Sequence, residues 1–301
     1  MLQGSIPAAW CFKCREGSVV RILMKKMKRQ DSWLLALDLD GTLIDEREEI
    51  NQETSHYLQA IMKEGHQVCI ATGRFFASAR LLAIRYNLRA PLISCNGSYI
   101  KDPFTLEEYF KLVIDGQEAR KVAEFAEEID TLLHIFMDDS WFVSKITPRV
   151  EKGGARYGVD ANLISEIREW GGRGIVKMVV VDAQEKINLV EEWTRKNCSK
   201  LGLIRSDPHS IDIINRKASK GNGVKKLAEL LGYSQDRIIA VGNYFNDIEM
   251  FRVARIGIAM GDSPLEVKEA ADYVTTSTAE GGIVEVIKRF ILNEEEYYAD
   301  I

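Results

Sequence analysis

The chain has 301 residues, 46% of them hydrophobic and 28% charged, a balance typical of globular proteins with room for about two domains. The net charge of −5, without an extended stripe of Lys and Arg, argues against a nucleic-acid partner. No apolar run approaches the roughly 18 residues of a membrane span, so no membrane partner is expected. Five scattered cysteines, an odd number, favour a reducing, cytoplasmic compartment over a disulfide framework. Nothing in the sequence predicts an oligomeric state.

The first part of the chain divides into a tail and a regular alternation of elements. Residues 1–30 show little periodicity, and we expect them to be a disordered tail outside the fold. Strands are predicted at residues 34–39, 66–71 and 91–94, with helices at residues 51–64 and 75–86. Strands that alternate with helices indicate a parallel sheet covered on both faces.

The pattern changes after residue 112. Helices are predicted at residues 116–128 and 183–197, and strands at residues 132–137, 141–146, 174–181, 201–205 and 211–214. Two hairpins with intervening helices predict a separate α+β domain, residues 113–215, inserted into the first. The glycine pairs at 153–154 and 171–172 are predicted to mark its loops.

The first pattern then returns and completes the fold. Helices are predicted at residues 223–231, 264–271 and 282–290, and strands at residues 238–241, 256–260 and 273–275. The predicted fold class is therefore α/β. A Rossmann-like, three-layer core with a central parallel sheet comprises residues 31–112 and 216–295 and carries the inserted α+β domain.

Asp38 and Asp40 follow the first apolar strand directly. Alternate residues of a strand point the same way, so both carboxylates are expected to project together at its carboxyl end, where open parallel sheets bind ligands. Two carboxylates held together repel unless a cation or a proton lies between them, and Mg²⁺ prefers such oxygen ligands. The alternative is a surface turn rich in Asp and Gly, which does not explain an apolar strand that delivers both acids.

Thr72 and Lys220 stand at two further predicted strand-to-helix junctions. The Thr72 hydroxyl and the free amides of a helix start bind phosphate oxygens, although a plain N-cap is the alternative. Lys220 is unusual at a helix start, since the helix dipole disfavours cations there, and this predicts a nearby anion. Arg74 adds a charged donor or is solvated, and Lys217 is a rival to Lys220.

The fourth junction follows the strand at 238–241. Asn243, Asn246 and Asp247 bring several oxygen atoms together there, as a Mg²⁺ site requires, while a helix cap is the alternative. Each junction is a weak signal by itself, but four at successive strand ends together predict one site.

These motifs resemble those of haloacid dehalogenase superfamily phosphatases of the Cof-like subgroup, which carry a large type IIB cap domain. The resemblance covers residues 33–290, and the inserted domain corresponds to the cap. The matching segments are 38–43 (Asp-Leu-Asp-Gly-Thr-Leu), 70–74 (Ile-Ala-Thr-Gly-Arg), 219–221 (Ser-Lys-Gly) and 242–247 (Gly-Asn-Tyr-Phe-Asn-Asp), together with 94–97 (Ser-Cys-Asn-Gly) and 257–261 (Gly-Ile-Ala-Met-Gly).

The resemblance implies a Mg²⁺-dependent phosphomonoester hydrolase that acts through an aspartyl-phosphate on a small phosphorylated metabolite, a sugar phosphate first of all. It implies that Asp38 is the nucleophile and Asp40 the general acid and base. The implied catalytic residues are Asp38, Asp40, Thr72 and Lys220; the implied substrate and phosphate ligands are Thr72, Gly73, Arg74, Asn96, Lys220 and Asn246; and the implied metal ligands are Asp38, Asp40, Asn243 and Asp247. A cap over such a site excludes water and reads the leaving group, with residues 173–177 as further candidates for specificity.

The fourth motif departs from the family pattern at Asn243, where the family has Asp as a metal ligand. An amide oxygen still binds Mg²⁺ but lacks the charge, so we expect weaker metal affinity rather than lost activity. Two other functions stay open. A phosphomutase of the same superfamily would return the phosphoryl group to substrate, and a catalytically weakened binding or regulatory protein would have Asn243 as its only supporting feature.

Overall fold

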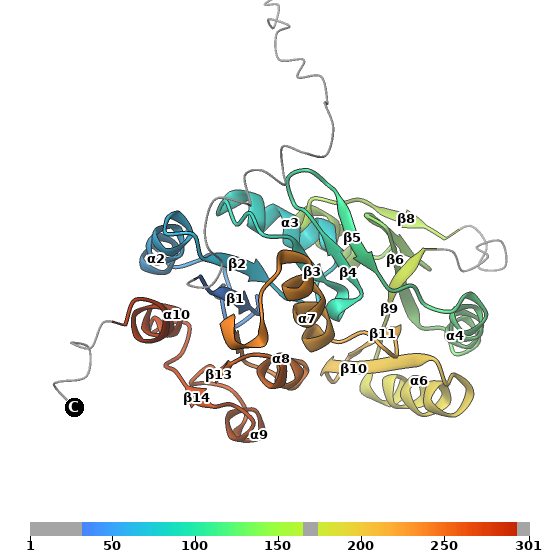
Figure 1. Cartoon of the computed structure of the whole chain (residues 1–301). Helices are drawn as coiled ribbons and strands as arrows, with labels where there is room; N and C mark the ends of the chain where they lie inside the picture. The colour runs from blue at the N-terminus through green and yellow to red at the C-terminus, as the bar shows by residue number, and fades with distance from the viewer. Residues whose placement is uncertain (1–31, 165–173, 294–301) are drawn as a thin grey trace, which may run out of the picture. The chain divides into compact units, whose positions relative to one another are not determined.

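The first strand, β1 (Leu34–Leu37), lies inside a five-stranded parallel sheet with the order β14-β13-β12-β1-β2. Figure 1 shows the computed structural model, which describes residues 32–164 and 174–293. The other strands of this sheet are β2 (Gln67–Ile70), β12 (Ile238–Gly242), β13 (Ile256–Ala259) and β14 (Tyr273–Val274). The predicted parallel α/β core is confirmed. The predicted N-terminal tail and the glycine pair at 171–172 lie outside the described residues.

Alternate residues of β1 pack into two different layers, which is the physical basis of the three-layer core. Leu35 and Leu37 belong to a core cluster with residues of α2 (Gln52–Lys63), α3 (Phe76–Arg85) and α10 (Gly282–Val286). Leu34 and Ala36 belong to a second cluster on the other face, with residues of α7 (Lys220–Leu231) and α8 (Ile248–Val253). A strand buried on both faces reads as a continuous apolar run, as this one does.

The segment after β2 contains two strands that the sequence did not predict. β3 (Leu92–Ser94), β4 (Tyr99–Lys101) and β5 (Glu108–Lys111) form a three-stranded antiparallel sheet, and an isolated bridge between Ala71 and Ile93 joins it to the end of β2. The two that were not predicted, β4 and β5, have three and four residues, too few to show a periodicity.

A six-stranded sheet, with the order β10-β11-β9-β6-β7-β8, is made entirely from residues of the predicted insert. Its strands are β6 (Leu132–Met137), β7 (Ser140–Val143), β8 (Ala161–Leu163), β9 (Ile175–Val181), β10 (Leu201–Asp207) and β11 (Ser210–Asn215). The helices α4 (Gly116–Glu128) and α6 (Gln184–Asn197) pack on one face of this sheet through a shared apolar cluster (Figure 1). From here on, "cap" denotes residues 113–164 and 174–215, and "core" denotes residues 32–112 and 216–293.

One helix of the cap corrects the sequence analysis. Gly153 and Gly154, predicted to mark a loop, lie inside α5 (Pro148–Tyr157). They are small because the helix approaches a neighbour closely: a Cβ on Gly153 would lie 3.2 Å from the ring of Trp141. The pair therefore indicates tight packing here rather than a break.

The carboxyl-terminal part follows the prediction with two shifts. Helix α7 begins at Lys220 rather than at residue 223, with Ser219 as its N-cap. The predicted helices at 264–271 and 282–290 are shorter, as α9 (Leu265–Glu269) and as α10 followed by a π-helical turn at Ile287–Ile291. In the described ranges, no helix is long and apolar enough to cross a membrane.

Candidate functional site

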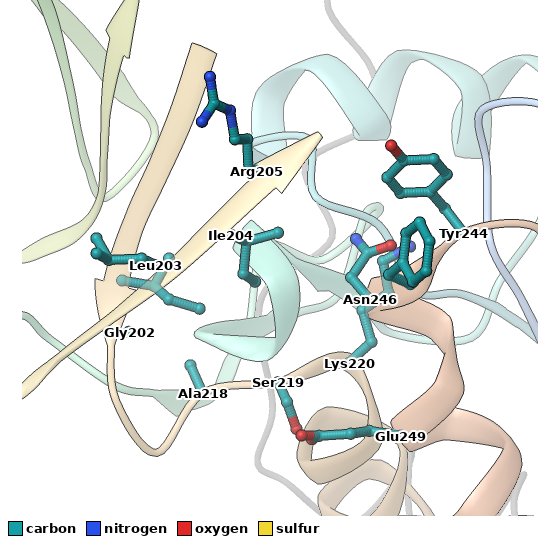
Figure 2. Close-up of a pocket in the computed structure, with 12 residues that line it drawn as sticks. Gly202, Leu203, Ile204, Arg205, Ala218, Ser219, Lys220, Tyr244, Asn246 and Glu249 are labelled. Carbon is teal, nitrogen blue, oxygen red and sulfur yellow. The ribbon is translucent and has the colours of Figure 1, made fainter. Parts of the chain in front are cut away.

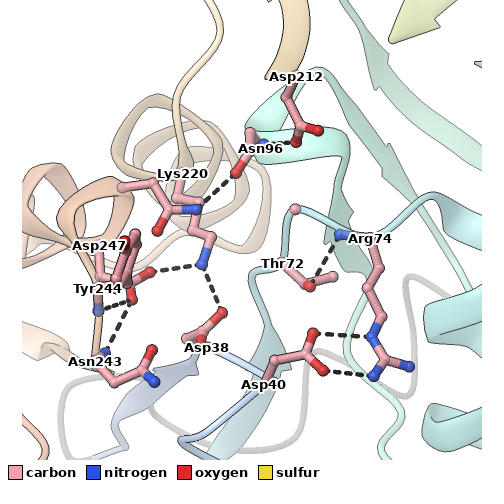
Figure 3. Close-up of polar contacts among 12 residues, drawn as sticks. Asp38, Asp40, Thr72, Arg74, Asn96, Asp212, Lys220, Asn243, Tyr244 and Asp247 are labelled. Carbon is pink, nitrogen blue, oxygen red and sulfur yellow. Dashed lines mark hydrogen bonds and ion pairs between the residues drawn. The ribbon is translucent and has the colours of Figure 1, made fainter. Parts of the chain in front are cut away.

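The predicted site residues meet beyond the carboxyl ends of the parallel strands (Figure 3). Asp38 directly follows β1, Thr72 follows β2 by two residues, and Asn243 directly follows β12. Lys220 is the first residue of α7. One site is therefore formed by three strand ends and one helix start that lie far apart in the sequence. In parallel sheets, ligands bind at the carboxyl ends of the strands.

Lys220 lies between two buried carboxylates. Its Nζ is 2.5 Å from Asp38 Oδ1 and 2.6 Å from Asp247 Oδ1, and the Lys220 side chain is only 2% exposed. The cation at this helix start is therefore compensated by two anions, which explains the anomaly seen in the sequence. Lys217, the rival, is exposed and is not part of this contact.

The burial of this triad shifts two pKa values. Burial raises the pKa of Asp38 to about 7, the charge of Asp247 adds to the rise, and Lys220 opposes it. For Lys220, burial lowers the pKa, but Asp247 and Asp38 raise it by more, so it lies above its usual value. Lys220 thus stays a cation, and Asp38 loses its proton less readily than an ordinary Asp.

Asp247 is fixed by the loop that precedes it. Its Oδ2 accepts hydrogen bonds from the backbone N–H groups of Asn243 at 2.9 Å and Tyr244 at 3.0 Å. The Asn243 side chain lies against the turn after Asp40, since a Cβ on Gly41 would come within 2.4 Å of its Nδ2. The fourth motif and the first are therefore in direct contact.

Asp40 pairs with Arg74 rather than with the triad of Lys220, Asp38 and Asp247. Strand β1 ends at Leu37, and the chain turns at Leu39, so the alternation of a strand does not reach Asp40. The Asp40 side chain is 55% exposed, and both of its oxygens accept hydrogen bonds from Arg74, at 2.9 Å from Nε and 2.5 Å from Nη2.

Arg74 is held from a second side by a residue that the sequence did not single out. Its Nη2 is 2.5 Å from Glu48 Oε1, which also pairs with Arg156 of the cap at 2.7 Å. Glu48 has a φ of 61°, an uncommon backbone conformation for a residue other than glycine. Burial opposes the change, but the charges and hydrogen bonds of Arg156 and Arg74 lower the pKa of Glu48. Arg74 is thus committed to two carboxylates rather than free for substrate.

Thr72 and Asn96 form the polar wall beside Lys220. Thr72 is 1% exposed, and its Oγ1 accepts a hydrogen bond from the Arg74 N–H at 3.1 Å. Thr72 is not the N-cap of α3, since that position is Phe75. Asn96 is fully buried, and its Oδ1 accepts a hydrogen bond from Asn246 Nδ2 at 2.9 Å. Asn96 follows Cys95 in a turn where both have a positive φ, 53° and 50°. Residues with such uncommon backbone conformations cluster at active sites and at ligand-binding turns.

A pocket of about 360 Å³ adjoins this wall (Figure 2). Strand β10 of the cap faces the turn before α8 across it, and Lys220 lies at its edge. Its lining residues are Gly202, Leu203, Ile204, Arg205, Ile214, Ala218, Ser219, Lys220, Tyr244, Phe245, Asn246 and Glu249. The lining is mixed, with aliphatic side chains, two aromatic rings and five polar or charged residues.

The donors near Lys220 suit a hard cation. Two buried carboxylates, Asp38 and Asp247, exceed the charge of the single ammonium by one when both are ionised. Carboxylate oxygens of this kind are the ligands that Mg²⁺ takes. Over the described ranges, no group of three or more His, Cys, Asp and Glu could hold a metal.

The sequence analysis missed Asp212 and included Lys177 only as a member of residues 173–177. Lys177 of β9 donates a hydrogen bond to the Gly73 carbonyl at 2.9 Å, and Asp212 of β11 accepts one from Asn96 Nδ2 at 3.0 Å. The signal was present for both, because each is a lone charge inside an apolar strand. Val176, next to Lys177, also reaches the core through an apolar cluster with Phe75 and Cys95.

Known proteins share this architecture. The family model of haloacid dehalogenase-like hydrolases matches residues 35–287. Two 5-amino-6-(5-phospho-D-ribitylamino)uracil phosphatases of Bacillus subtilis, YitU and YcsE, are 25% and 28% identical to the chain. Each match covers 97% of the relative, and 86% and 87% of this chain respectively. The solved subclass IIB sugar phosphatase BT4131 is 27% identical with a TM-score of 0.76, covering 86% of this chain and 99% of its own.

These matches extend over the core and the cap together, and they agree with the motifs and with the parallel sheet. The chain therefore belongs to the haloacid dehalogenase-like hydrolases, and it is a phosphatase of that family.

Proposed function

We propose that the protein is a Mg²⁺-dependent phosphomonoesterase that acts on a small phosphorylated metabolite through an aspartyl-phosphate on Asp38. The contact of Lys220 with both Asp38 and Asp247 is the observation that carries the proposal. It places a permanent cation beside a buried carboxylate, where a phosphoryl group with its several negative charges needs neutralisation. Catalysis of phosphoryl transfer is mostly positioning and charge neutralisation of this kind.

In the proposed first step an Asp38 carboxylate oxygen forms a bond to phosphorus while the bond from phosphorus to the leaving oxygen breaks. Asp40 gives its proton to that oxygen, so the product leaves as an alcohol. In the second step Asp40 takes a proton from a water molecule whose oxygen attacks phosphorus, and the bond to Asp38 breaks to release inorganic phosphate. Asp40 is well placed for exchange with water because its side chain is 55% exposed.

Thr72, Gly73 and Lys220 would hold the phosphoryl oxygens, with Asn96 and Asn246 beside them. A bound Mg²⁺ would neutralise charge on the phosphoryl group, and the residues that would hold it are Asp38, the Asp40 carbonyl, Asn243 and Asp247. Arg74 would serve mainly to orient Asp40, given its two hydrogen bonds to that carboxylate. This differs from the direct role in substrate binding that the resemblance implied.

Two substrate classes have support. A sugar phosphate agrees with the sugar phosphatase among the solved relatives. A phosphate ester with a ring in its leaving group agrees with two aromatic residues that line the pocket, Tyr244 and Phe245. Phosphorylated ribitylaminouracil, the substrate in the names of two relatives, combines a polyol with a ring.

The test is release of inorganic phosphate from p-nitrophenyl phosphate and from a panel of sugar phosphates and ring-bearing phosphate esters, with Mg²⁺ and with chelator. We expect Mg²⁺-dependent release that Asp38→Asn abolishes, because an amide is no nucleophile toward phosphorus. Turnover that survives in Asp38→Asn would refute the nucleophile assignment. Isomerised phosphoester without free phosphate would indicate a mutase, and ligand binding without turnover by the wild type would indicate a regulatory protein.

A further inference from the structure

A line of buried polar contacts crosses from the cap to the core beside the phosphate site. Lys177 Nζ donates to the Gly73 carbonyl at 2.9 Å and to Asp212 Oδ2 at 2.5 Å. The same Asp212 oxygen accepts from Asn96 Nδ2 at 3.0 Å, as Figure 3 shows. Asn96 in turn accepts from Asn246 at 2.9 Å. The cap therefore contacts the turn after Thr72, and through Asn96 it reaches the fourth motif as well.

The cap sheet presents this pair to the core because of its register. Asp212 is opposite Val179 in the ladder, and Val179 is two residues from Lys177, so all three share one face of the sheet. The neighbours of Asp212 in β11, Ile211 and Ile213, point to the opposite face and pack with α4 and α6. The placement of the two charges is thus dictated by the strand pattern.

The pair is poorly explained as a device for attaching the cap. Lys177 is 7% exposed and Asp212 8%, and a buried ion pair is often no more stabilising than apolar residues of the same size. An apolar cluster already joins cap and core nearby, with Phe75 and Cys95 from the core and Phe136 and Trp141 from the cap. Attachment alone would be served by extending that cluster.

We propose that Lys177 and Asp212 are positioning residues that set the phosphate-binding groups of the core when the cap is seated. This inference rests on the function proposed above. Lys177 holds the Gly73 carbonyl, and thereby orients the turn whose Thr72 hydroxyl and amides face the phosphoryl group. Asp212 accepts a hydrogen bond from the Asn96 amide nitrogen, which orients the Asn96 amide oxygen toward Asn246. The donors are in place only while the cap covers the site, so hydrolysis is coupled to cap closure.

The experiment compares Lys177→Met and Asp212→Asn with a matched control, Lys101→Met. Lys101 of β4 also makes an ion pair between core and cap, with Asp139 at 2.5 Å. Its other partners are the rings of Phe76 and Tyr99, which do not belong to the phosphate site. With p-nitrophenyl phosphate we expect kcat to fall at least tenfold in both test variants and KM to rise, because displaced phosphate-binding groups also weaken binding of the substrate. Lys101→Met should keep kcat within about twofold. An equal loss in the control, or a normal kcat in the test variants, overturns the inference.

Two further variants and a binding measurement complete the experiment. Lys177→Arg, which keeps the charge and donors, should recover part of kcat. The double variant Lys177→Met with Asp212→Leu should fold, because an apolar pair replaces a buried ion pair, yet should stay slow; normal kcat in it overturns the inference. Titration calorimetry with inorganic phosphate should show at least tenfold weaker binding to Lys177→Met than to wild type, and unchanged affinity would refute the positioning role. The binding arm applies even if wild type hydrolyses none of the esters, in which case only the proposed function fails.

Discussion

At the scale of single residues, the site is defined by two buried carboxylates that share one ammonium. Asp38 and Asp247 both contact Lys220, and burial together with the Asp247 charge raises the pKa of Asp38. The resemblance implies a third carboxylate at the position of Asn243, which would add to the negative charge around Lys220. The amide reduces that repulsion and reduces the attraction for a divalent cation at the same time.

We predict that Asn243→Asp binds Mg²⁺ more tightly. A carboxylate at this position adds a charged ligand, and we expect the half-saturating Mg²⁺ concentration to fall about tenfold, since ligand charge tunes affinity for such cations. The measurement is phosphate release over a Mg²⁺ titration at fixed substrate. Asn222→Asp, on an exposed face of α7, is the control for added charge alone. An unchanged or higher half-saturation in Asn243→Asp would count against a metal ligand at this position.

His134 makes stability depend on pH. Burial lowers its pKa from 6.5 to about 4, with the charges of Arg149 and Lys177 contributing, and its Nδ1 accepts a hydrogen bond from Trp141 Nε1 at 3.0 Å. Between these two pKa values the unfolded chain binds the proton and the folded chain does not. The free energy of unfolding should therefore fall as the pH drops from 6.5 to 4, by about 3 kcal/mol at most.

Urea unfolding of wild type and His134→Asn over this pH range checks the prediction. The variant should be less stable at pH 7, and the difference between the two proteins should shrink on acidification. His56→Asn, at an exposed position of α2, should follow wild type throughout. A constant difference between wild type and His134→Asn would mean that His134 does not titrate in this range.

At the scale of elements, the turn Cys95–Gly97 is pressed against the start of α7. A Cβ on Gly97, whose φ is 89°, would lie 1.9 Å from the Ser219 carbonyl oxygen. The absence of a side chain thus lets the turn that carries Asn96 approach the helix that begins with Lys220. This contact joins the segment 94–97 to the motif at residues 219–221.

Gly97→Ala should therefore lose both stability and activity. We expect at least about 3 kcal/mol of destabilisation, from left-handed strain and from displacement of the Ser219 backbone. Gly281→Ala is a matched control, because Gly281 has a φ of 87° and no atom within 4 Å of its Cβ position. Gly281→Ala should lower the free energy of unfolding by only about 1 to 2 kcal/mol, the cost of the backbone strain alone. Equal losses in denaturant unfolding would show that the close approach does not matter.

At the scale of the whole molecule, aromatic side chains seal the cap to the core beside the phosphate turn. Phe75, directly after Arg74, stacks on Phe136 of the cap at a ring distance of 4.7 Å and meets Tyr157 edge-on at 5.7 Å. Arg156, next to Tyr157, pairs with Glu48 of the core. The cap thus contacts the core at Phe75, next to Arg74, and at Glu48, which pairs with Arg74. Closure of the cap and the orientation of Arg74 are therefore expected to depend on each other.

Phe75→Ala should loosen this seal. We expect a loss of about 3 kcal/mol in unfolding free energy and roughly a tenfold lower kcat/KM, because a cap that opens admits water and releases substrate. Phe125→Ala removes an aromatic ring stacked on Trp193 at 4.5 Å inside the cap, and it should destabilise while keeping kcat/KM within about twofold. The measurements are steady-state kinetics and urea unfolding of both variants. An equal fall in kcat/KM for Phe125→Ala would contradict a specific role of the contact between cap and core.

Much of the architecture was readable from local patterns. The apolar strand before Asp38 and the glycines that end helices are local signals, and the parallel core they predict is confirmed. Short strands such as β4 and β5 were missed because three or four residues show no period. Helix α5 was missed because its glycines, placed by the packing of Trp141, look like loop residues.

The sequence by itself determined the family, the α/β class and which residue types gather at the strand ends, because these depend on periodicity and on short motifs. Only the tertiary structure decided the partners of each side chain. It paired Asp40 with Arg74, paired Arg74 also with Glu48, and brought Lys177 and Asp212 of the cap to Gly73 and Asn96. Contacts between residues up to 116 positions apart arise from how the cap sheet faces the core, and no local pattern encodes that.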